Sequence, residues 1–376
     1  MKKLFLKIGL LLVIVFAICQ LILMSMPFSW GNTRLNTKYT TYSENPEQYN
    51  TLLIGASTTY RHIDPKQFDA AVNAQYPDLH IKSFNFGIPA NRTPQSMYML
   101  ENLLKEGNTD HIKYVVIDLS ELTKMGADNL HKKEMLYWYN WGNIGDVMKA
   151  SYESEKGTAN KFGVPFLHAF SFGEKSFLVG MGPSVIMQHA GLNIEPLSVG
   201  PDKNGFYSLD QEMHDDPEGD LAIRYNDLRT QDTIDFRTQR CQMLYDKFKD
   251  AKKNPNKTME ADLLKIIKDC EKQDISVVIM LSQRLGDRYE YLIPLYNRIP
   301  EKNRIGFQNP SAYPMFNERE NLFDLAHLNS SGAKLFTDIF ADQWIDRLIM
   351  QGKIAPRPVA PLNSLQQTNS GTGDAL

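Results

Sequence analysis

The stretch Thr51-Leu-Leu-Ile-Gly-Ala-Ser57-Thr-Thr-Tyr-Arg61 opens with a short apolar run and changes at Gly55 to small and polar residues. Such a run is typical of a buried strand that ends in a tight turn. Further apolar, β-branched runs occur at Ile81–Phe86, Tyr114–Leu119 and Ser276–Leu281, and amphipathic stretches follow most of them. Alternating strands and helices predict an α/β fold with a mainly parallel sheet covered by helices on both faces, a three-layer α/β/α sandwich.

Two of the expected helices have clear boundary signals. Before the apolar stripe that follows the second strand, Thr93 is a plausible N-cap and Pro94 suits the first turn. The last helix should run from Gly332 to about Ile349, because aromatic and aliphatic residues recur there at helical spacing. We interpret these aromatic residues as core rather than as a binding surface.

The first 30 residues have the features of a membrane anchor. Lys2, Lys3 and Lys7 precede an apolar run from Ile8 to Met26, which is long enough to cross a bilayer. Lysines before such a run favour an N-terminus in the cytoplasm and the remaining chain outside. A cleaved signal peptide is the alternative, but the run is longer than a usual signal and no A-x-A site follows it. We expect an uncleaved anchor with its domain extracytoplasmic, in the periplasm or at the cell surface.

The remaining chain divides by composition. Residues 31–48 are polar and predict an irregular tether, and one α/β domain is expected over residues 49–350. Between about 124 and 250 the alternation of strands and helices stops and aromatic residues and glycines are frequent, which indicates a large insertion or cap. Residues 351–376 are polar with few apolar side chains, and we expect a disordered tail.

The overall composition argues against several functions. The 376 residues carry a net charge of −3, and the lysines and arginines are scattered, so we expect no nucleic-acid partner. The acidic run His214–Asp220 lacks the spacing of a calcium loop, and the other histidines lack ligand spacing, so no metal site is expected.

Cys241 and Cys270 are the cysteines outside the anchor. An oxidising compartment would permit a disulfide between them. The favoured alternative is a free Cys270 packed in the core, because Met259, Leu263, Ile266 and Cys270 share one face of a helical pattern.

A serine, a histidine and an aspartate occupy positions that suit nucleophilic chemistry. Ser57 lies in the turn after the first strand, where α/β sheets bind ligands, although a helix-capping role would account for it equally well. Near the other end of the chain, Asp324 precedes His327 by three residues, just before the last helix. Asp324 can orient His327, and His327 can take a proton from Ser57, as in a catalytic triad.

These residues resemble blocks one and five of the SGNH/GDSL hydrolase family, whose fold is flavodoxin-like. The motif Asn85-Phe-Gly87-Ile-Pro-Ala90 resembles its block two, N-x-G-x-x-G. The resemblance covers about residues 50–120 and 273–349. It is strongest to a membrane-anchored branch that includes a teichoic-acid alanylation protein and alginate acetylation proteins. It implies oxyanion or substrate-binding roles for Asn85, Gly87 and Ala90.

The sequence departs from the family pattern at three places. Ala56 replaces the usual Asp, Ala90 stands where the family has a glycine of the oxyanion hole, and Asp118-Leu-Ser-Glu121 replaces the Gly-x-Asn-Asp block. The backbone N–H groups of Ser57 and Ala90 can still bind an oxyanion, because a backbone donor calls for a glycine only where its φ is positive. Arg61 and Arg284 are expected near the same rim, where they could bind an anionic polymer or headgroup.

We therefore expect an extracytoplasmic O-acyl ester hydrolase or O-acyltransferase that needs no cofactor. The resemblance implies a cell-surface polysaccharide or an acylated small molecule as substrate. It also implies a membrane-bound acyltransferase of the MBOAT class as partner. The alternative is a non-catalytic polysaccharide-binding or scaffolding subunit on the same fold, which the departures at Ala56 and Ala90 motivate.

Overall fold

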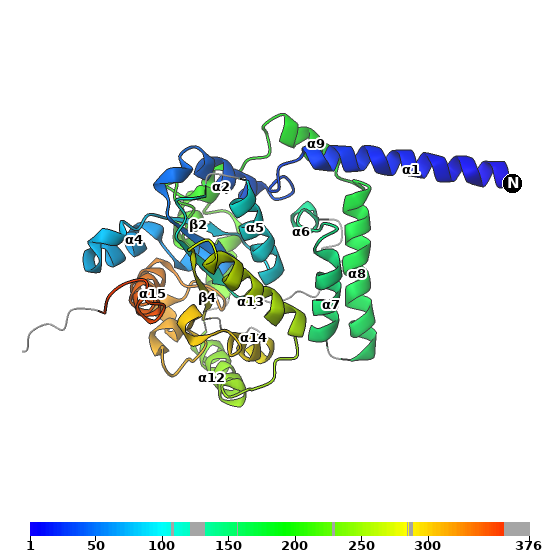
Figure 1. Cartoon of the computed structure of the whole chain (residues 1–376). Helices are drawn as coiled ribbons and strands as arrows, with labels where there is room; N and C mark the ends of the chain where they lie inside the picture. The colour runs from blue at the N-terminus through cyan, green and yellow to red at the C-terminus, as the bar shows by residue number, and fades with distance from the viewer. Residues whose placement is uncertain are drawn as a thin grey trace, which may run out of the picture.

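A parallel sheet forms the centre of the protein in the computed structural model (Figure 1). The structure describes residues 1–106, 109–120, 132–155, 157–227, 230–283, 285 and 289–356. Within these residues the sheet has five strands in the order β2-β1-β3-β4-β5, and every neighbouring pair is parallel. The strands are β1 (Thr51–Gly55), β2 (Ser83–Gly87), β3 (Tyr114–Asp118), β4 (Ser276–Leu281) and β5 (Arg304–Gly306). The predicted α/β class with a parallel sheet is confirmed.

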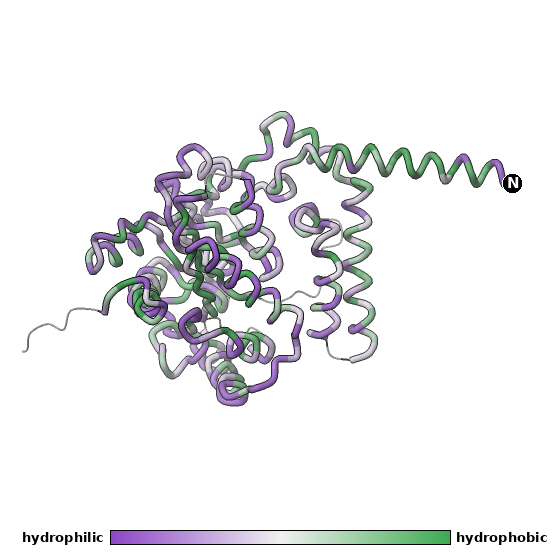
Figure 2. The backbone as a smooth tube through the Cα atoms, viewed as in Figure 1, coloured by the Kyte–Doolittle hydropathy of each residue, from purple (hydrophilic) through white to green (hydrophobic). Residues whose placement is uncertain are grey.

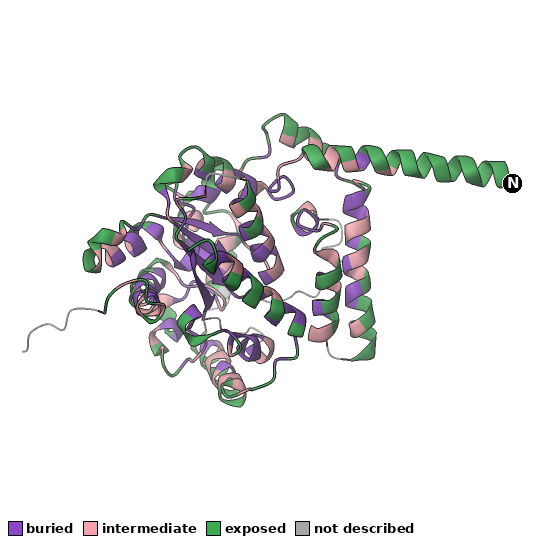
Figure 3. Cartoon of the chain, viewed as in Figure 1, coloured by how far each residue is buried: buried purple, intermediate pink, exposed green. Residues whose placement is uncertain are grey.

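The N-terminal helix α1 (Lys2–Ser25) projects away from the rest of the chain (Figure 1). It is apolar along most of its length (Figure 2) and exposed along most of its length (Figure 3). Its 24 residues are long and apolar enough to cross a membrane.

The segment predicted to be an irregular tether is instead a helix, and that prediction is wrong. Helix α2 (Thr33–Ser43) begins where the Asn32 side chain accepts a hydrogen bond from the Leu35 N–H at 3.0 Å. Leu35 is fully buried, and the Tyr42 ring contacts the Phe84 and Phe86 rings of β2. The segment has few apolar residues, but Leu35, Tyr39 and Tyr42 lie on one face of the helix. Their packing attaches α2 to the edge of the sheet.

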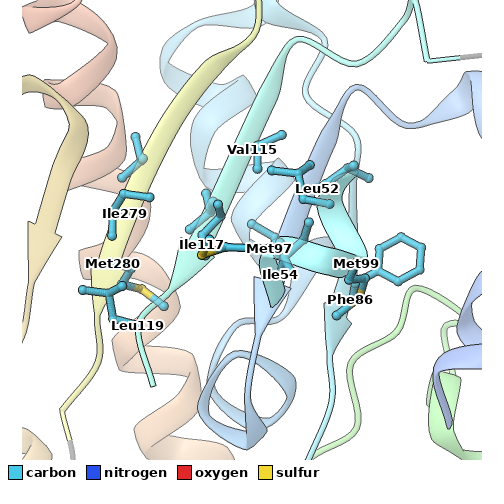
Figure 4. Close-up of a cluster of buried hydrophobic side chains, with 14 of the residues drawn as sticks. Leu52, Ile54, Phe86, Met97, Met99, Val115, Ile117, Leu119, Ile279 and Met280 are labelled. Atoms are coloured by element: carbon cyan, nitrogen blue, oxygen red, sulfur yellow. The ribbon is translucent and has the colours of Figure 1, made fainter. Parts of the chain in front are cut away.

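The strands are buried on both faces, as expected for a parallel sheet. Figure 4 shows Leu52 and Ile54 of β1 beside Val115 and Ile117 of β3. Because β-branched and aliphatic side chains fill the spaces between strands and helices, the first three strands keep a fixed register, with Thr51 opposite both Ser83 and Tyr114. The carboxyl ends of the strands are therefore aligned.

Two groups of helices pack beside the sheet. Phe68 in α4 contacts the rings of Phe340 and Trp344 in the last helix, and α5 contacts α13. The last helix confirms the prediction from periodicity, whereas Thr93 is the first residue of α5 and Arg92 takes the N-cap position. Besides α2, the helices that contact the strands of the sheet include α3 (Ser57–His62), α4 (Pro65–Gln75), α5 (Thr93–Lys105), α13 (Lys257–Glu271), α14 (Tyr289–Tyr296) and α15 (Ser330–Met350).

The described part of the expected insertion is mainly helical. In Figure 1, α7 and α8 stand side by side, apart from the sheet, and α8 also contacts α1. The helices are α6 (Lys133–Leu136), α7 (Ile144–Ser154), α8 (Thr158–Ser176), α9 (Gly182–His189), α10 (Leu209–Asp215), α11 (Asp220–Asp227) and α12 (Gln231–Phe248). Short 3₁₀ turns occur at Pro46–Gln48, Pro77–Leu79, Pro196–Val199, Glu301–Asn303, Pro314–Asn317 and Arg319–Asn321.

The two cysteines of the folded part are both buried, free thiols, so the structure has no bridge between Cys241 and Cys270. Burial raises the pKa of the Cys270 thiol to about 11, which keeps it protonated and unreactive at neutral pH. The chain after α15 is described as far as residue 356, and the predicted disordered tail lies largely outside the described residues.

Candidate active site

Ser57 lies at the carboxyl end of β1, between β2 and β3. In a sheet of order 2-1-3-4-5 the chain reverses its direction of winding at this place, and ligands bind there in doubly wound proteins. The turn is tight: a Cβ on Gly55 would lie 2.1 Å from the Thr59 hydroxyl oxygen. This close approach lets Ser57 be the first residue of α3, where its N–H has no partner within the helix.

Asp324 and His327 lie in the short loop that precedes α15, and hydrogen bonds hold this loop in place. The Phe323 N–H donates to the His327 carbonyl at 2.9 Å, and Leu322 pairs with Leu328 in an antiparallel bridge. His62 of α3 accepts the Leu328 N–H at its Nε2 atom, at 3.0 Å. The first and last parts of the domain are thus joined directly at the site.

The three predicted residues form a continuous chain of hydrogen bonds. The Ser57 hydroxyl lies 2.8 Å from His327 Nε2, and His327 Nδ1 lies 2.9 and 3.1 Å from the two Asp324 carboxylate oxygens. We assign the proton to Nδ1, because a carboxylate can only accept, so that Nε2 accepts from Ser57. The side chain of His327 is 14% exposed and that of Asp324 is 4% exposed. The histidine is thus partly open to solvent, while the aspartate is shielded from water.

The charge on Asp324 is stabilised by its neighbours. Burial alone would raise the pKa of this carboxyl group, but the hydrogen bond and charge of His327, the Ala326 N–H and the Arg224 guanidinium hold it well below its usual range. Arg224 pairs with Asp324 from α11 of the insertion, a contact that nothing in the sequence pattern indicated. Asp324 therefore remains ionised at neutral pH, as an orienting carboxylate must.

Asp118 forms the floor of the site. It is fully buried at the end of β3 and accepts hydrogen bonds from the Thr58 and Thr59 hydroxyls of α3. It also accepts from the N–H and hydroxyl of Ser282, which follows β4, at 3.3 and 2.9 Å. This carboxylate therefore joins the ends of β1, β3 and β4.

Asn85 and Gly87, at the end of β2, hold the helix that begins with Ser57. The Asn85 side-chain amide donates to the carbonyls of Thr59 and Ile63 at 2.7 and 2.9 Å, and its oxygen accepts from the Gly87 N–H at 2.8 Å. A Cβ on Gly87 would lie 2.3 Å from the Tyr60 backbone nitrogen, so only glycine fits. Both residues hold α3 against β2. The Asn85 amide and the Gly87 N–H are both hydrogen-bonded within the fold.

Ala90 has a positive φ, the one condition under which a glycine is expected at this position. Its φ is +60°, in the left-handed region that strains a side chain with a Cβ. No acceptor for its N–H is present among the described residues. The neighbouring Asn91 amide is turned away and donates to the Gly55 carbonyl and the Ser96 hydroxyl. Ala90 thus keeps a backbone donor, while both nearby asparagine amides serve the fold.

Arg61, expected near the rim as an anion-binding residue, is instead held within the fold. Its guanidinium is buried, donates to the Tyr207 carbonyl at 2.7 Å and forms an ion pair with Glu212 of α10. It also lies over the Tyr60 ring, 4.1 Å from the centroid. The charge of Arg61 therefore joins α3 to the insertion. Arg284, the second expected rim residue, lies outside the described residues.

Lys38 is an unpredicted part of the site's support. Its ammonium group, fully buried, donates to the carbonyls of Asn85, Gly87 and Gly205 at 3.0, 2.7 and 2.6 Å. Burial lowers the pKa of Lys38 well below its usual value, and the charges of Arg61 and Arg34 lower it further. The helix mistaken for a tether thus fixes the loop that leads to Ala90.

Among the described residues, no group of three or more His, Cys, Asp or Glu side chains could hold a metal ion. No protein-family model matches the chain, and no curated protein matches it. Any account of function therefore rests on the chain's own residues and geometry.

Proposed function

We propose that this protein is a serine-dependent O-acyl ester hydrolase or O-acyltransferase of the SGNH type. The observation that carries the proposal is the hydrogen-bonded series from Ser57 through His327 to Asp324 at the carboxyl end of β1. The arrangement of α4 with α15 and of α5 with α13 further suggests the three-layer sandwich expected of that family.

The geometry suggests the following steps. Ser57 Oγ attacks the carbonyl carbon of an acyl ester while His327 Nε2 takes its proton. The N–H groups of Ser57 and Ala90 stabilise the negative oxygen of the tetrahedral intermediate. When the C–O bond to the leaving alcohol breaks, His327 returns the proton to that alcohol. Water or a sugar hydroxyl then attacks the acyl-serine in the same way, with the same proton transfers.

The proposed setting is the outer side of a membrane. Helix α1 would anchor the chain, and Lys2, Lys3 and Lys7 favour a cytoplasmic N-terminus. The resemblance in motifs suggests a cell-surface polysaccharide or an acylated small molecule as substrate. It also suggests an MBOAT-type acyltransferase that supplies acyl groups.

Turnover of a simple ester tests the proposal. The detergent-solubilised full chain should hydrolyse p-nitrophenyl acetate, and Ser57→Ala should abolish the activity without changing the circular dichroism spectrum. Ser311→Ala, which alters a serine near the chain's surface, is the matched control.

The non-catalytic alternative has one observation in its favour. The amides of Asn85 and Asn91 are both engaged by the fold, so neither completes an oxyanion hole. If Ser57→Ala left acylation of the cell-surface polymer unchanged in cells, this scaffolding function would be preferred.

A further inference from the structure

Helix α8 has an apolar outer face. Phe162, Phe166 and Phe170 recur at intervals of four residues, and their side chains are 66%, 66% and 49% exposed. Residues four apart lie above one another on a helix, so the three rings form one stripe. An exposed apolar stripe longer than two helical turns marks a site that contacts another protein or a membrane.

The inner face of α8 carries buried polar side chains. His168 Nδ1 lies 2.7 Å from the Tyr139 hydroxyl, and the Lys175 ammonium donates to the carbonyls of Tyr137 and Tyr139. Glu174 is also buried. The helix is therefore reversed relative to a surface helix in water, where polar side chains face outward. Its outer face suits an apolar surrounding.

Helix α8 is attached to α1. The Gln20 amide donates to the Ser176 carbonyl at 2.9 Å, and the rings of Phe16 and Phe177 are 5.3 Å apart. Figure 1 shows α8 running across the line of α1 rather than along it. If α1 crosses a bilayer, α8 must then lie along the membrane surface.

The position of this contact along α1 gives the depth of α8 in the bilayer. A hydrocarbon core of about 30 Å needs about 20 helical residues, such as Leu4–Leu23, within which the long Lys7 side chain can extend to the headgroups at the cytoplasmic end. Phe16 and Gln20 lie three to seven residues before Leu23, which places α8 roughly 5–10 Å below the boundary. Helices that lie in the interface are buried to that depth.

Neighbouring residues fit the same environment. Trp141 is 68% exposed, and its ring lies 4.7 Å from that of Phe172. With Trp30, these residues line a cavity of about 190 Å³ between the end of α1 and α8. Tryptophan is enriched where hydrocarbon meets headgroups. From residue 176 to 194 the chain contains no Asp, Glu, Lys or Arg.

We propose that the stripe of Phe162, Phe166 and Phe170 inserts into the lipid leaflet from which α1 emerges. Lipid is the occupant because the stripe is continuous, through the contact with α1, with a surface that must face lipid. The proposal rests on α1 being a membrane anchor. Two elements, rather than one, then fix the orientation of the Ser57 site relative to the membrane.

Photocrosslinking in native membranes tests this with the full chain. Phe166 is replaced by p-benzoylphenylalanine, in membranes that contain a clickable phospholipid. Phe5 of α1, 68% exposed, serves as the lipid-facing reference, and Phe236 of α12, 61% exposed, as the reference away from α8. We expect lipid adducts at position 166 within about threefold of those at position 5 and at least about tenfold above those at position 236, as for a ring among acyl chains.

The outcomes separate the possibilities. Lipid adducts at position 5 but only background at position 166 would overturn the inference and leave the anchor intact. A discrete protein adduct at position 166 would overturn it in favour of a membrane-protein partner. Absence of lipid adducts at position 5 would contradict the anchor and the inference together, while leaving the Ser57 chemistry untouched.

Discussion

Asp324→Asn is the substitution with the most specific expected effect on catalysis. It preserves the size of a side chain that is 4% exposed, so the loop before α15 should keep its shape. The carboxylate accepts the His327 Nδ1 proton at 2.9 and 3.1 Å. An amide there is uncharged and can donate to Nδ1 instead, which would place the imidazole proton on Nε2, facing Ser57. His327 could then no longer accept the Ser57 proton.

The expected loss can be expressed as a rate. In a serine protease with a Ser-His-Asp triad, the same substitution lowers kcat about 10⁴-fold. We expect about 10³- to 10⁴-fold here, or about 4–5.5 kcal/mol of transition-state stabilisation. The smaller value applies if Arg224, which pairs with the carboxylate, keeps the loop oriented after the charge is removed.

The assay is initial-rate hydrolysis of p-nitrophenyl acetate over a range of concentrations. Asp269→Asn, on the exposed surface of α13, is the matched control and should retain full activity. Because the three residues act as a unit, Ser57→Ala combined with Asp324→Asn should be no slower than Ser57→Ala alone. Retention of more than about one tenth of wild-type kcat by folded Asp324→Asn would refute the role assigned to Asp324, since that is a loss of less than 1.4 kcal/mol.

Three further predictions concern the stability of the fold. Asp118→Ala should lower the free energy of unfolding by about 3 kcal/mol in urea denaturation, because buried hydroxyls lose their acceptor; a change below 1 kcal/mol would contradict this. Ala90→Gly should raise it by about 0.5–1 kcal/mol, because glycine relieves the positive φ, and a decrease would argue against that conformation. Burial lowers the pKa of Lys175 to about 7, so the native state binds fewer protons than the unfolded chain from there up to about 10.4. The free energy of unfolding should therefore rise with pH across that window. Lys175→Met should have a flatter dependence of Tm on pH than the wild type, and equal slopes of Tm against pH in the two proteins would contradict the lowered pKa of Lys175.

The sequence predicted those parts of the site whose information is local. Ser57 follows a strand and a tight turn, and Asp324 and His327 lie three residues apart before a helix, so each could be placed on its own element. Their meeting followed from the rule that the carboxyl ends of parallel strands share one edge. The strand Arg304–Gly306 was not predicted, since three residues carry no readable periodicity.

What the sequence did not predict depends on partners distant in the chain. Arg61 looked like a surface charge because Glu212, which neutralises it, lies 151 residues away in the insertion. Arg224 and Lys38 reach the site from segments without strand or motif signals. A buried charge is acceptable only when its partners are in place, and those partners are set by the path of the chain.

Covalent labelling of Ser57 tests the central claim most directly. The purified full chain is treated with a fluorophosphonate, which reacts with activated serines, and the modified residue is mapped by mass spectrometry. We expect one adduct, on the peptide that contains Ser57, and its loss in Ser57→Ala and His327→Ala. Folded protein that remains unlabelled, or labelling that persists unchanged in Ser57→Ala, would contradict the account.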